Sequence, residues 1–248
     1  MSTKAPTKFA VIASQRTGST LLIRSLDSSP YVFCAGELFH AGGGIYHPEC
    51  QFPYRLMGSR RLSRLVNTRL LPWRPASHLR HFYATAPNQV HAVGFKLMIS
   101  HAKTFATILP SLQSLGVTLL YLFREDSIAT ALSYYKAKAS GLFHTNNYDT
   151  DASSRDIYAD TDEFSKILKV CSADRSNILS LHQTFGGHLM SYEQMTAHWD
   201  SFILQLGAWI GVPQLRVEQA LSRVSGKNSL VRIMNESQLR DLFHDNSG

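Results

Sequence analysis

The chain has 248 residues, of which 44% are hydrophobic, a composition typical of a soluble globular protein with a sizeable core. We expect one domain over residues 1–248. No apolar run reaches the roughly 18 residues that a membrane span needs, and the N-terminus does not look like a signal peptide. The three cysteines, Cys34, Cys50 and Cys171, are far apart. They therefore indicate neither a disulfide framework nor a metal site, and they favour a reducing, cytoplasmic compartment.

The net charge of +7 is concentrated in one segment. Between Ile45 and Val90 there are seven arginines and a single acid, Glu49, while the rest of the chain is close to neutral. A solvated basic face or an acidic acceptor is the favoured interpretation. Peripheral contact of the basic segment 55–70 with a membrane stays open as an alternative. Nucleic acid is not an expected partner, because no DNA- or RNA-reading pattern is recognisable.

The predicted elements alternate along the chain. Short apolar runs predict strands at 9–13, 31–34, 92–98, 117–123 and 188–192. Helical spacing predicts helices at 19–27, 104–115, 127–139, 162–185 and 194–210. This alternation predicts an α/β fold of three layers, in which helices flank a central parallel sheet with right-handed crossovers.

The basic segment 45–87 fits this alternation poorly. The spacing of Leu62, Leu65, Val66 and Leu70 predicts an amphipathic helix with arginines beside the apolar stripe. We expect the segment to be an insertion that covers the carboxyl ends of the strands on the acceptor side.

The first chemical signal follows the first strand and reads Ser14-Gln-Arg-Thr-Gly-Ser-Thr20. A turn that enters a helix presents unpaired N–H groups and the positive end of the helix dipole to an anion. Gly18 permits close backbone approach, Arg16 adds a guanidinium, and the Ser19 and Thr20 hydroxyls add donors. The pattern predicts a phosphate site. The alternative is an ordinary strand-to-helix turn, since the lysine of nucleotide-hydrolase loops is missing.

The second signal follows the strand at 117–123. Arg124 stands where that strand ends, Ser127 is placed to cap the next helix, and Ser133 lies nine residues after Arg124. Ligands of doubly wound sheets bind at the carboxyl ends of strands, so a second anion subsite is expected at the same edge. The alternative is that Arg124 pairs with a neighbouring acid and that Ser133 is an ordinary helix residue.

Together these pieces resemble the bacterial carbohydrate sulfotransferases of the trehalose type and the nodulation-factor or lipopolysaccharide type. Similar pieces occur in order from about residue 8 to about residue 240: Ser14–Leu22, Gly36-Glu-Leu-Phe-His40, Gly94-Phe-Lys-Leu97, Arg124 with Ser133, Ser191-Tyr-Glu193, and Arg223–Leu230 with Asn235. Segment 45–87 matches no part of the family. Two details depart from the better-known cytosolic sulfotransferases: the serine is nine rather than eight residues after the arginine, and Arg16 replaces a lysine.

The resemblance implies a P-loop-like fold and a donor, 3′-phosphoadenosine 5′-phosphosulfate, with adenosine 3′,5′-bisphosphate as product and no metal. The sulfuryl group would pass in line to a hydroxyl of a carbohydrate or glycoconjugate. Such a transfer needs alignment and charge stabilisation more than covalent catalysis. Arg16 and the amides of Thr17, Gly18, Ser19 and Thr20 would hold the 5′-phosphate, and Arg16 would also stabilise the departing charge.

The resemblance also assigns the remaining site residues. Arg124 and Ser133 would bind the 3′-phosphate, and Lys227 would close over the same group. Glu37 matches the position of the general base in the trehalose-type enzymes.

Several assignments near this base stay open. The alternative for Glu37 is a glutamate in the first turn of a helix, and the alternative base is His40. Lys96 is placed either to contact the sulfuryl group or acceptor or to form a structural ion pair. Glu193 is expected to anchor a helix start or a loop near the nucleotide crevice.

Two other functions remain compatible with the residues. One is a nucleotide- or anion-binding module without transfer activity. The other is a small P-loop kinase, although kinases usually need a lysine in the loop and a metal ion. Activity in the presence of a chelator distinguishes a sulfotransferase from a kinase.

Overall fold

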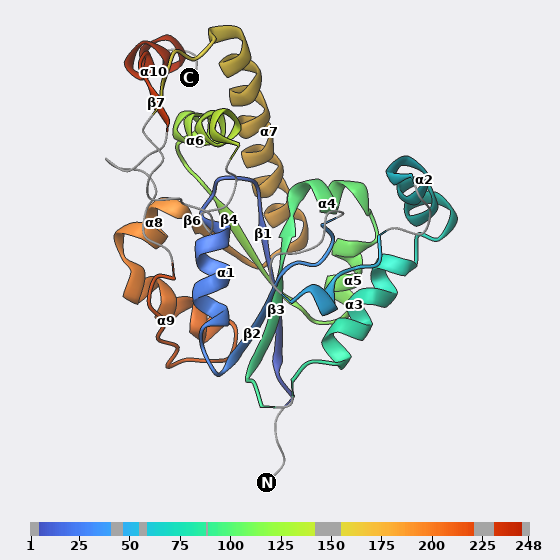
Figure 1. Cartoon of the computed structure of the whole chain (residues 1–248). Helices are drawn as coiled ribbons and strands as arrows, with labels where there is room; N and C mark the ends of the chain where they lie inside the picture. Colours follow the sequence, from blue (N-terminus) through green and yellow to red (C-terminus); the bar gives the residue numbers. More distant parts are fainter. Residues whose placement is uncertain are drawn as a thin grey trace. The chain divides into compact units, whose positions relative to one another are not determined.

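The computed structural model describes residues 5–40, 47–54, 59–87, 89–141, 155–220 and 231–244 (Figure 1). They form two compact units. The first comes from residues 1–123 and 177–220, and the second from residues 124–176 and 221–248. The single domain expected from the sequence stays a prediction.

The first unit is built on a parallel sheet of five strands: β1 (Thr7–Ala13), β2 (Val32–Glu37), β3 (Ala92–Met98), β4 (Thr118–Phe123) and β6 (His188–Ser191). Their order across the sheet is β2-β3-β1-β4-β6, and every neighbouring pair is parallel. The predicted α/β fold is therefore confirmed. The chain visits one side of β1 and then the other, so the order reverses at β1, and the loop after β1 lies where such sheets bind ligands.

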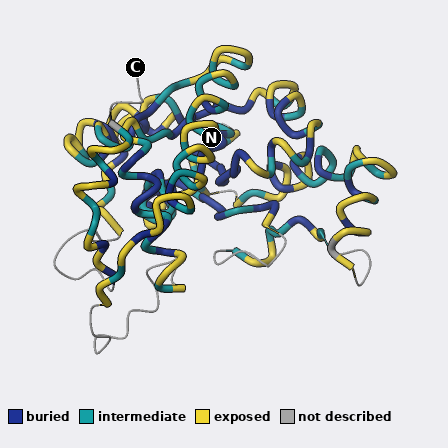
Figure 2. The backbone as a smooth tube through the Cα atoms, turned by 90° about the horizontal axis from the view of Figure 1, so that it is seen from above, coloured by how far each residue is buried: buried dark blue, intermediate teal, exposed yellow. Residues whose placement is uncertain are grey.

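Helices cover both faces of this sheet (Figure 1). Phe9, Val11 and Ala13 of β1 pack in one core cluster with α1 (Ser19–Asp27), α8 (Tyr192–Ala197) and α9 (Trp199–Trp209). Ala10 and Ile12 belong to the opposite cluster, with α3 (Arg74–Ala84), α4 (Ile99–Thr104), α5 (Ile108–Ser114) and the last part of α7 (Thr161–Phe185). Figure 2 shows the strands as mostly buried and the outer helix turns as exposed. This is why β1 reads as a continuous apolar run.

Gly94 of β3 leaves room on the α1 face for the side chain of Phe9 on β1. It is the register partner of Phe9, and a Cβ at position 94 would lie 2.4 Å from the Phe9 ring. The phenyl ring therefore occupies the space that a side chain on β3 would need.

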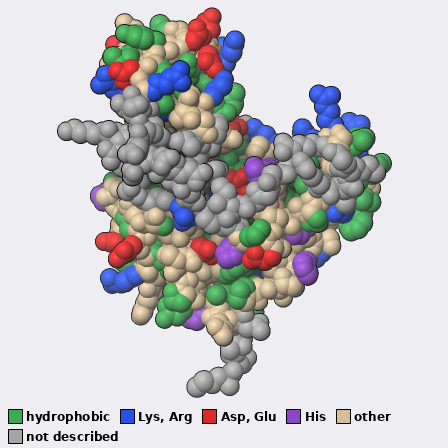
Figure 3. Space-filling view, viewed as in Figure 1, with side chains coloured by type: hydrophobic (Ala, Val, Ile, Leu, Met, Phe, Trp, Pro, Cys, Tyr) green, Lys and Arg blue, Asp and Glu red, His purple; other side chains and the backbone are tan. Residues whose placement is uncertain are grey.

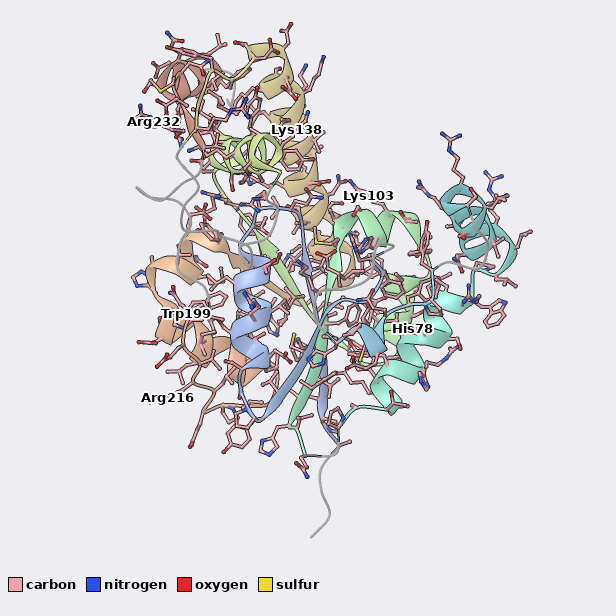
Figure 4. The ribbon with its side chains drawn as sticks, viewed as in Figure 1. His78, Lys103, Lys138, Trp199, Arg216 and Arg232 are labelled. Atoms are coloured by element: carbon pink, nitrogen blue, oxygen red, sulfur yellow. The ribbon has the colours of Figure 1, made fainter. Side chains whose placement is uncertain are left out.

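One of the predicted helices is divided in the structure and another is shorter than expected. The helix expected at 104–115 is α5, which begins at Ile108, and α4, which ends at Thr104, was not predicted. The helix expected at 194–210 is divided into α8 and α9. His198 separates the latter pair with a non-helical backbone, φ −134° and ψ 53°. Trp199, labelled in Figure 4, then begins α9. It donates its indole N–H to the Val217 carbonyl at 2.8 Å.

The basic segment 45–87 contributes to the core of the first unit. Besides η1 (Pro48–Cys50), α2 (Arg60–Leu65) and the π-helical turn η2 (Val66–Leu70), it contains α3. Leu79 and Phe82 of α3 are buried against the sheet, and the Tyr83 hydroxyl donates to the Phe9 carbonyl at 2.8 Å. This corrects the expectation that the whole segment is an insertion over the strand ends, because α3 covers a face of the sheet.

The second unit has its own small core. It contains α6 (Ser127–Ser140), the first part of α7, the parallel pair β5 (Arg155–Ile157) and β7 (Val231–Ile233), and α10 (Glu236–His244). The core side chains include Leu132, Tyr135, Phe164, Ile233 and Leu239. The sequence did not predict β5, β7 or α10, since three-residue strands are too short to show an alternating pattern.

Candidate functional site

The loop between β1 and α1 has an unusual backbone. Arg16 has φ 63° and Gly18 has φ 78°, so two residues separated by one are left-handed. Such a run turns neighbouring N–H groups toward one point, which makes a concave anion site. The Thr17 hydroxyl holds the turn, because it donates to the Ser14 carbonyl at 2.9 Å in a buried position. Thr17 therefore uses its hydroxyl within the loop, and the phosphate role predicted for Thr17 rests on its amide.

Gly18 is the N-cap of α1 and has no side chain to occupy the first-turn amides. A Cβ here would lie 2.5 Å from the Tyr192 ring and 2.9 Å from the end of Met195. Position 18 thus favours glycine over any residue with a side chain for two reasons, the positive φ and the close approach of α8. The side chains of Tyr192 and Met195 therefore lie directly against the loop at Gly18, on the α1 side of the sheet.

A β-bulge at the end of β2 sets the position of Glu37. Ala35 pairs with Phe95 and Glu37 pairs with Lys96, so Gly36 is an extra residue in the ladder. Regular alternation would place Glu37 on the same face as Ala35. The bulge instead places Glu37 directly opposite Lys96 of β3. Glu37 is a strand residue in β2, which corrects the alternative of a glutamate in the first turn of a helix.

Glu37 and Lys96 form an ion pair beside the loop. The Lys96 Nζ lies 2.8 Å from the Glu37 Oε1, and their side chains are 7% and 19% exposed. The same Nζ donates to the Thr20 hydroxyl at 3.4 Å. Lys96 therefore joins the candidate base to the first turn of α1. The ion pair that the sequence left open for Lys96 is therefore present, and its contact with the sulfuryl group or the acceptor stays a prediction.

The electrostatics keep the Glu37 carboxylate ionised. Burial raises the pKa of Glu37, but the charge and the hydrogen bond of Lys96 outweigh burial, so the pKa of Glu37 lies below its usual value. An ionised carboxylate is the form that accepts a proton. The lowered pKa also makes Glu37 a weaker base while Lys96 is bound to it.

His101 is a member of the site that the sequence did not indicate. It lies on α4, directly after β3, and its ring centroid is 6.4 Å from that of His40. Burial lowers the pKa of His101 to about 4; Glu37 opposes this shift, and His40 and Lys96 add to it. His101 is thus neutral at pH 7. Its buried Nδ1 has no hydrogen-bond partner among the described residues. The missed signal was the continuation of the 92–98 strand directly into a helix.

The Glu37 carbonyl connects the site to the segment that follows η1. The Gln51 Nε2 donates to the Glu37 carbonyl at 3.0 Å, and the Phe52 amide donates to the Leu38 carbonyl at 2.8 Å. The His40 amide also donates to the Glu37 carbonyl, at 3.3 Å. The backbone at Glu37 and directly after it is therefore held by hydrogen bonds to the segment that follows η1.

The predicted 3′-phosphate residues belong to the second unit. Arg124 and Ser133 are both half-buried, Arg124 before α6 and Ser133 within it. The N-cap of α6 is Asp126, whose carboxylate accepts from the Ala129 amide at 2.7 Å, so the prediction that Ser127 caps this helix is wrong. The meeting of Arg124 and Ser133 with the loop after β1 stays a prediction. Lys227 lies outside the described residues.

Glu193 lies in the first turn of α8, as expected for a residue at a helix start. The cap itself is Ser191, whose hydroxyl accepts from the Gln194 amide at 3.1 Å. Across the described parts of the chain, no group of three or more His, Cys, Asp or Glu side chains is arranged to hold a metal ion.

Comparisons with known proteins address the fold. No protein-family model and no curated protein matches the chain. Among solved structures, a sulfotransferase from Alicyclobacillus acidocaldarius aligns with a TM-score of 0.53 at 13% identity, covering 98% of this chain and 92% of the other. The sulfotransferase domain of the curacin biosynthetic pathway also aligns with a TM-score of 0.53, at 15% identity over 96% of this chain and 91% of that domain. The fold is therefore one that solved sulfotransferases have.

Proposed function

We propose that this protein is a sulfotransferase that moves the sulfuryl group of 3′-phosphoadenosine 5′-phosphosulfate to a hydroxyl of a carbohydrate or glycoconjugate. The observation that carries the proposal is the position of Lys96, 2.8 Å from the Glu37 carboxylate and 3.4 Å from the Thr20 hydroxyl. One cation thus links a candidate base to the first turn of α1, directly after the loop that we propose binds a phosphate. The shared fold supports the same activity.

The loop residues would bind the 5′ end of the donor. The amides from Thr17 to Thr20 and the Arg16 guanidinium would surround the 5′-phosphate. As the bond between sulfur and the bridging oxygen breaks, negative charge grows on the leaving phosphate. Arg16 would stabilise that charge, because a preorganised cation in a partly buried site is worth more than one in water.

Glu37 would take the proton of the attacking hydroxyl. Protonation removes the negative charge of Glu37 and so weakens its ion pair with Lys96. The Lys96 ammonium would then be available to the sulfuryl oxygens during transfer. His101 is an electrostatic neighbour of Glu37 and Lys96, and it is neutral at pH 7. It would therefore add no further positive charge near Glu37.

The test is transfer of labelled sulfate from this donor to a panel of sugars and glycoconjugates, with and without a chelator. We expect transfer that persists in chelator. The R16A variant should lose most of it, because the loop cation is gone. The R216A variant is the matched control: Arg216 is exposed and lies on the α9 side of the first unit, so it should retain activity (Figure 4).

Three outcomes would contradict the proposal. Donor binding without transfer to any acceptor would favour a binding module. Phosphoryl transfer that requires a metal ion would favour a kinase. Equal activity of R16A and R216A would remove the loop from the reaction.

A further inference from the structure

The helical pair α2–η2 packs on the first unit through a polar face. Ser63 and Asn67, four residues apart, are both fully buried. The Asn67 Nδ2 donates to the Tyr54 carbonyl at 2.9 Å and to the Ser63 carbonyl at 2.8 Å. Arg74 of α3 donates to the Asn67 Oδ1. On the side of α2–η2 that packs on the first unit, hydrogen bonds therefore satisfy the polar atoms of the Asn67 side chain.

The apolar side chains of this segment point outward instead. Leu62 is 49% exposed, Leu65 43%, Leu70 66% and Trp73 58%. These exposures reverse the usual arrangement of an amphipathic surface helix, in which the leucine stripe packs on the core. Four large exposed apolar side chains between residues 62 and 73 mark a candidate interaction surface.

Basic side chains lie among these leucines. Arg61, Arg64 and Arg69 are all exposed, and none of them forms a salt bridge with another described residue. The only acid between residues 45 and 90 is Glu49, which pairs with His47 at 3.2 Å. Figure 3 shows blue basic and green hydrophobic side chains next to one another at the corner formed by α2. These three arginines and four apolar residues are called the α2 surface below.

We propose that the α2 surface docks this protein on an anionic lipid bilayer. Leucine and tryptophan side chains enter the boundary between head groups and acyl chains, while arginines bind the anionic head groups. A soluble acidic acceptor or a nucleic acid would engage the arginines but would leave the leucines in water. A bilayer is the partner that uses both sets at once. Over the described residues no helix is both long and apolar enough to cross a membrane, so the contact is peripheral.

The segment is anchored well enough to act as a docking element. Besides the Asn67 bonds, the Thr107 hydroxyl donates to the Pro72 carbonyl at 3.0 Å, and Arg74 donates to the Pro53 carbonyl at 3.2 Å. Docking therefore needs little ordering of the backbone, and its cost is limited to the outward side chains.

Co-sedimentation with vesicles tests the proposal independently of any enzymatic activity. The whole protein is mixed with vesicles of phosphatidylcholine, with and without phosphatidylserine. We expect binding that requires phosphatidylserine. The R61Q/R64Q/R69Q variant should lose about 100-fold in partition coefficient, since each arginine near the surface contributes about a factor of five. The K166Q/K169Q/R216Q variant removes the same charge from exposed residues elsewhere and should bind normally.

A second variant separates the apolar contribution. L62S/L65S should weaken binding by at least about tenfold, whereas L204S, at a leucine that is 38% exposed on α9, should not. Trp73 gives a direct readout: its fluorescence should shift to the blue on vesicle binding, and the shift should vanish in W73F. Thermal unfolding of each variant confirms that its fold is intact.

The proposal is overturned if the protein ignores anionic vesicles at low salt, or if the two charge variants lose binding equally. It is also overturned if soluble glycerophosphoserine, the free head group, binds the protein as tightly as the vesicles do and displaces it from them. The target would then be a soluble anion. A change of oligomeric state in L62S/L65S, with vesicle binding unchanged, would assign the leucines to a second copy of the chain.

Discussion

Glu37 and Lys96 depend on one another for both stability and chemistry. The pair is largely buried, with Lys96 7% exposed and Glu37 19% exposed. Removing one partner of such a pair leaves the other charge poorly compensated. A single substitution at either position therefore mixes a loss of function with a loss of stability, and the two effects need to be separated.

We expect E37Q to lose about 10²–10⁴ in transfer rate, because the group that accepts the acceptor proton is gone. It should also lower the free energy of unfolding by about 1–3 kcal/mol, through the weakened bond to Lys96. Binding of adenosine 3′,5′-bisphosphate should be nearly unchanged. Steady-state transfer, urea unfolding and calorimetry measure the three quantities.

The double variant E37Q/K96M separates the two effects. It removes both members of the pair, so it should recover stability relative to E37Q and remain slow in transfer. If E37Q transfers sulfate at nearly the wild-type rate, His40 becomes the candidate base. The H40A variant would then test that role.

His101 gives the site a characteristic dependence of stability on pH. Its pKa in the folded protein is about 4 against an ordinary value of 6.5. Between these values the unfolded chain binds more protons than the folded one, so the free energy of unfolding falls as the pH is lowered from 6.5 toward 4. Compared with H101Q, the wild-type protein should lose up to roughly 3 kcal/mol over this range.

Urea unfolding at several pH values measures the difference between the two proteins. The comparison cancels the contributions of the other histidines, including His78 and His188, whose pKa values are also lowered by burial. Parallel curves for wild type and H101Q would show that His101 titrates normally.

At the scale of the elements, β1 and β3 are matched in shape through Phe9 and Gly94. A methyl group at position 94 would lie 2.4 Å from the Phe9 ring. We expect G94A to lower the free energy of unfolding by about 1–3 kcal/mol, because a packed core cannot absorb the added carbon. Urea unfolding of G94A, F9L and F9L/G94A measures the coupling. F9L should offset part of the cost of G94A, and strictly additive effects would contradict the proposed clash.

Periodicity in the sequence predicts the strands and long helices well and predicts the site less well. β3 and α1 have the predicted bounds, because their apolar residues repeat with the spacing of a buried element. The division of α8 from α9 at His198 follows from tertiary packing and leaves no breaker residue in the sequence. The loop after β1 is predictable, since its composition determines it. The face of the sheet on which Glu37 lies is not predictable, because a bulge at Gly36 changes the register without changing the composition.

At the scale of the whole molecule, the residues predicted to bind the two phosphates come from different units. The loop with Arg16 belongs to the first unit, and Arg124 with Ser133 belongs to the second. We expect adenosine 3′,5′-bisphosphate to bind at least about tenfold more tightly than adenosine 5′-monophosphate, because hydrogen bonds to a charged phosphate are worth roughly 1.5–3 kcal/mol. Calorimetry with the two nucleotides measures the ratio.

Two variants assign this preference to residues. R124A should erase the difference between the two nucleotides, whereas R16A should weaken both. R155Q, at an exposed arginine of the second unit, serves as the control and should change neither affinity. Equal affinities in the wild-type protein would remove the 3′-phosphate subsite from the second unit.

The extra residue at Gly36 bears on how relatives of this chain are recognised. A protein with a regular β2 would carry its carboxylate one position earlier and still set it opposite the lysine of β3. Two such chains would share the same constellation while differing by one residue in the distance from Cys34 to the carboxylate. A search pattern of fixed spacing would find one and pass over the other. A pattern that allows a single-residue gap at this place would recover both.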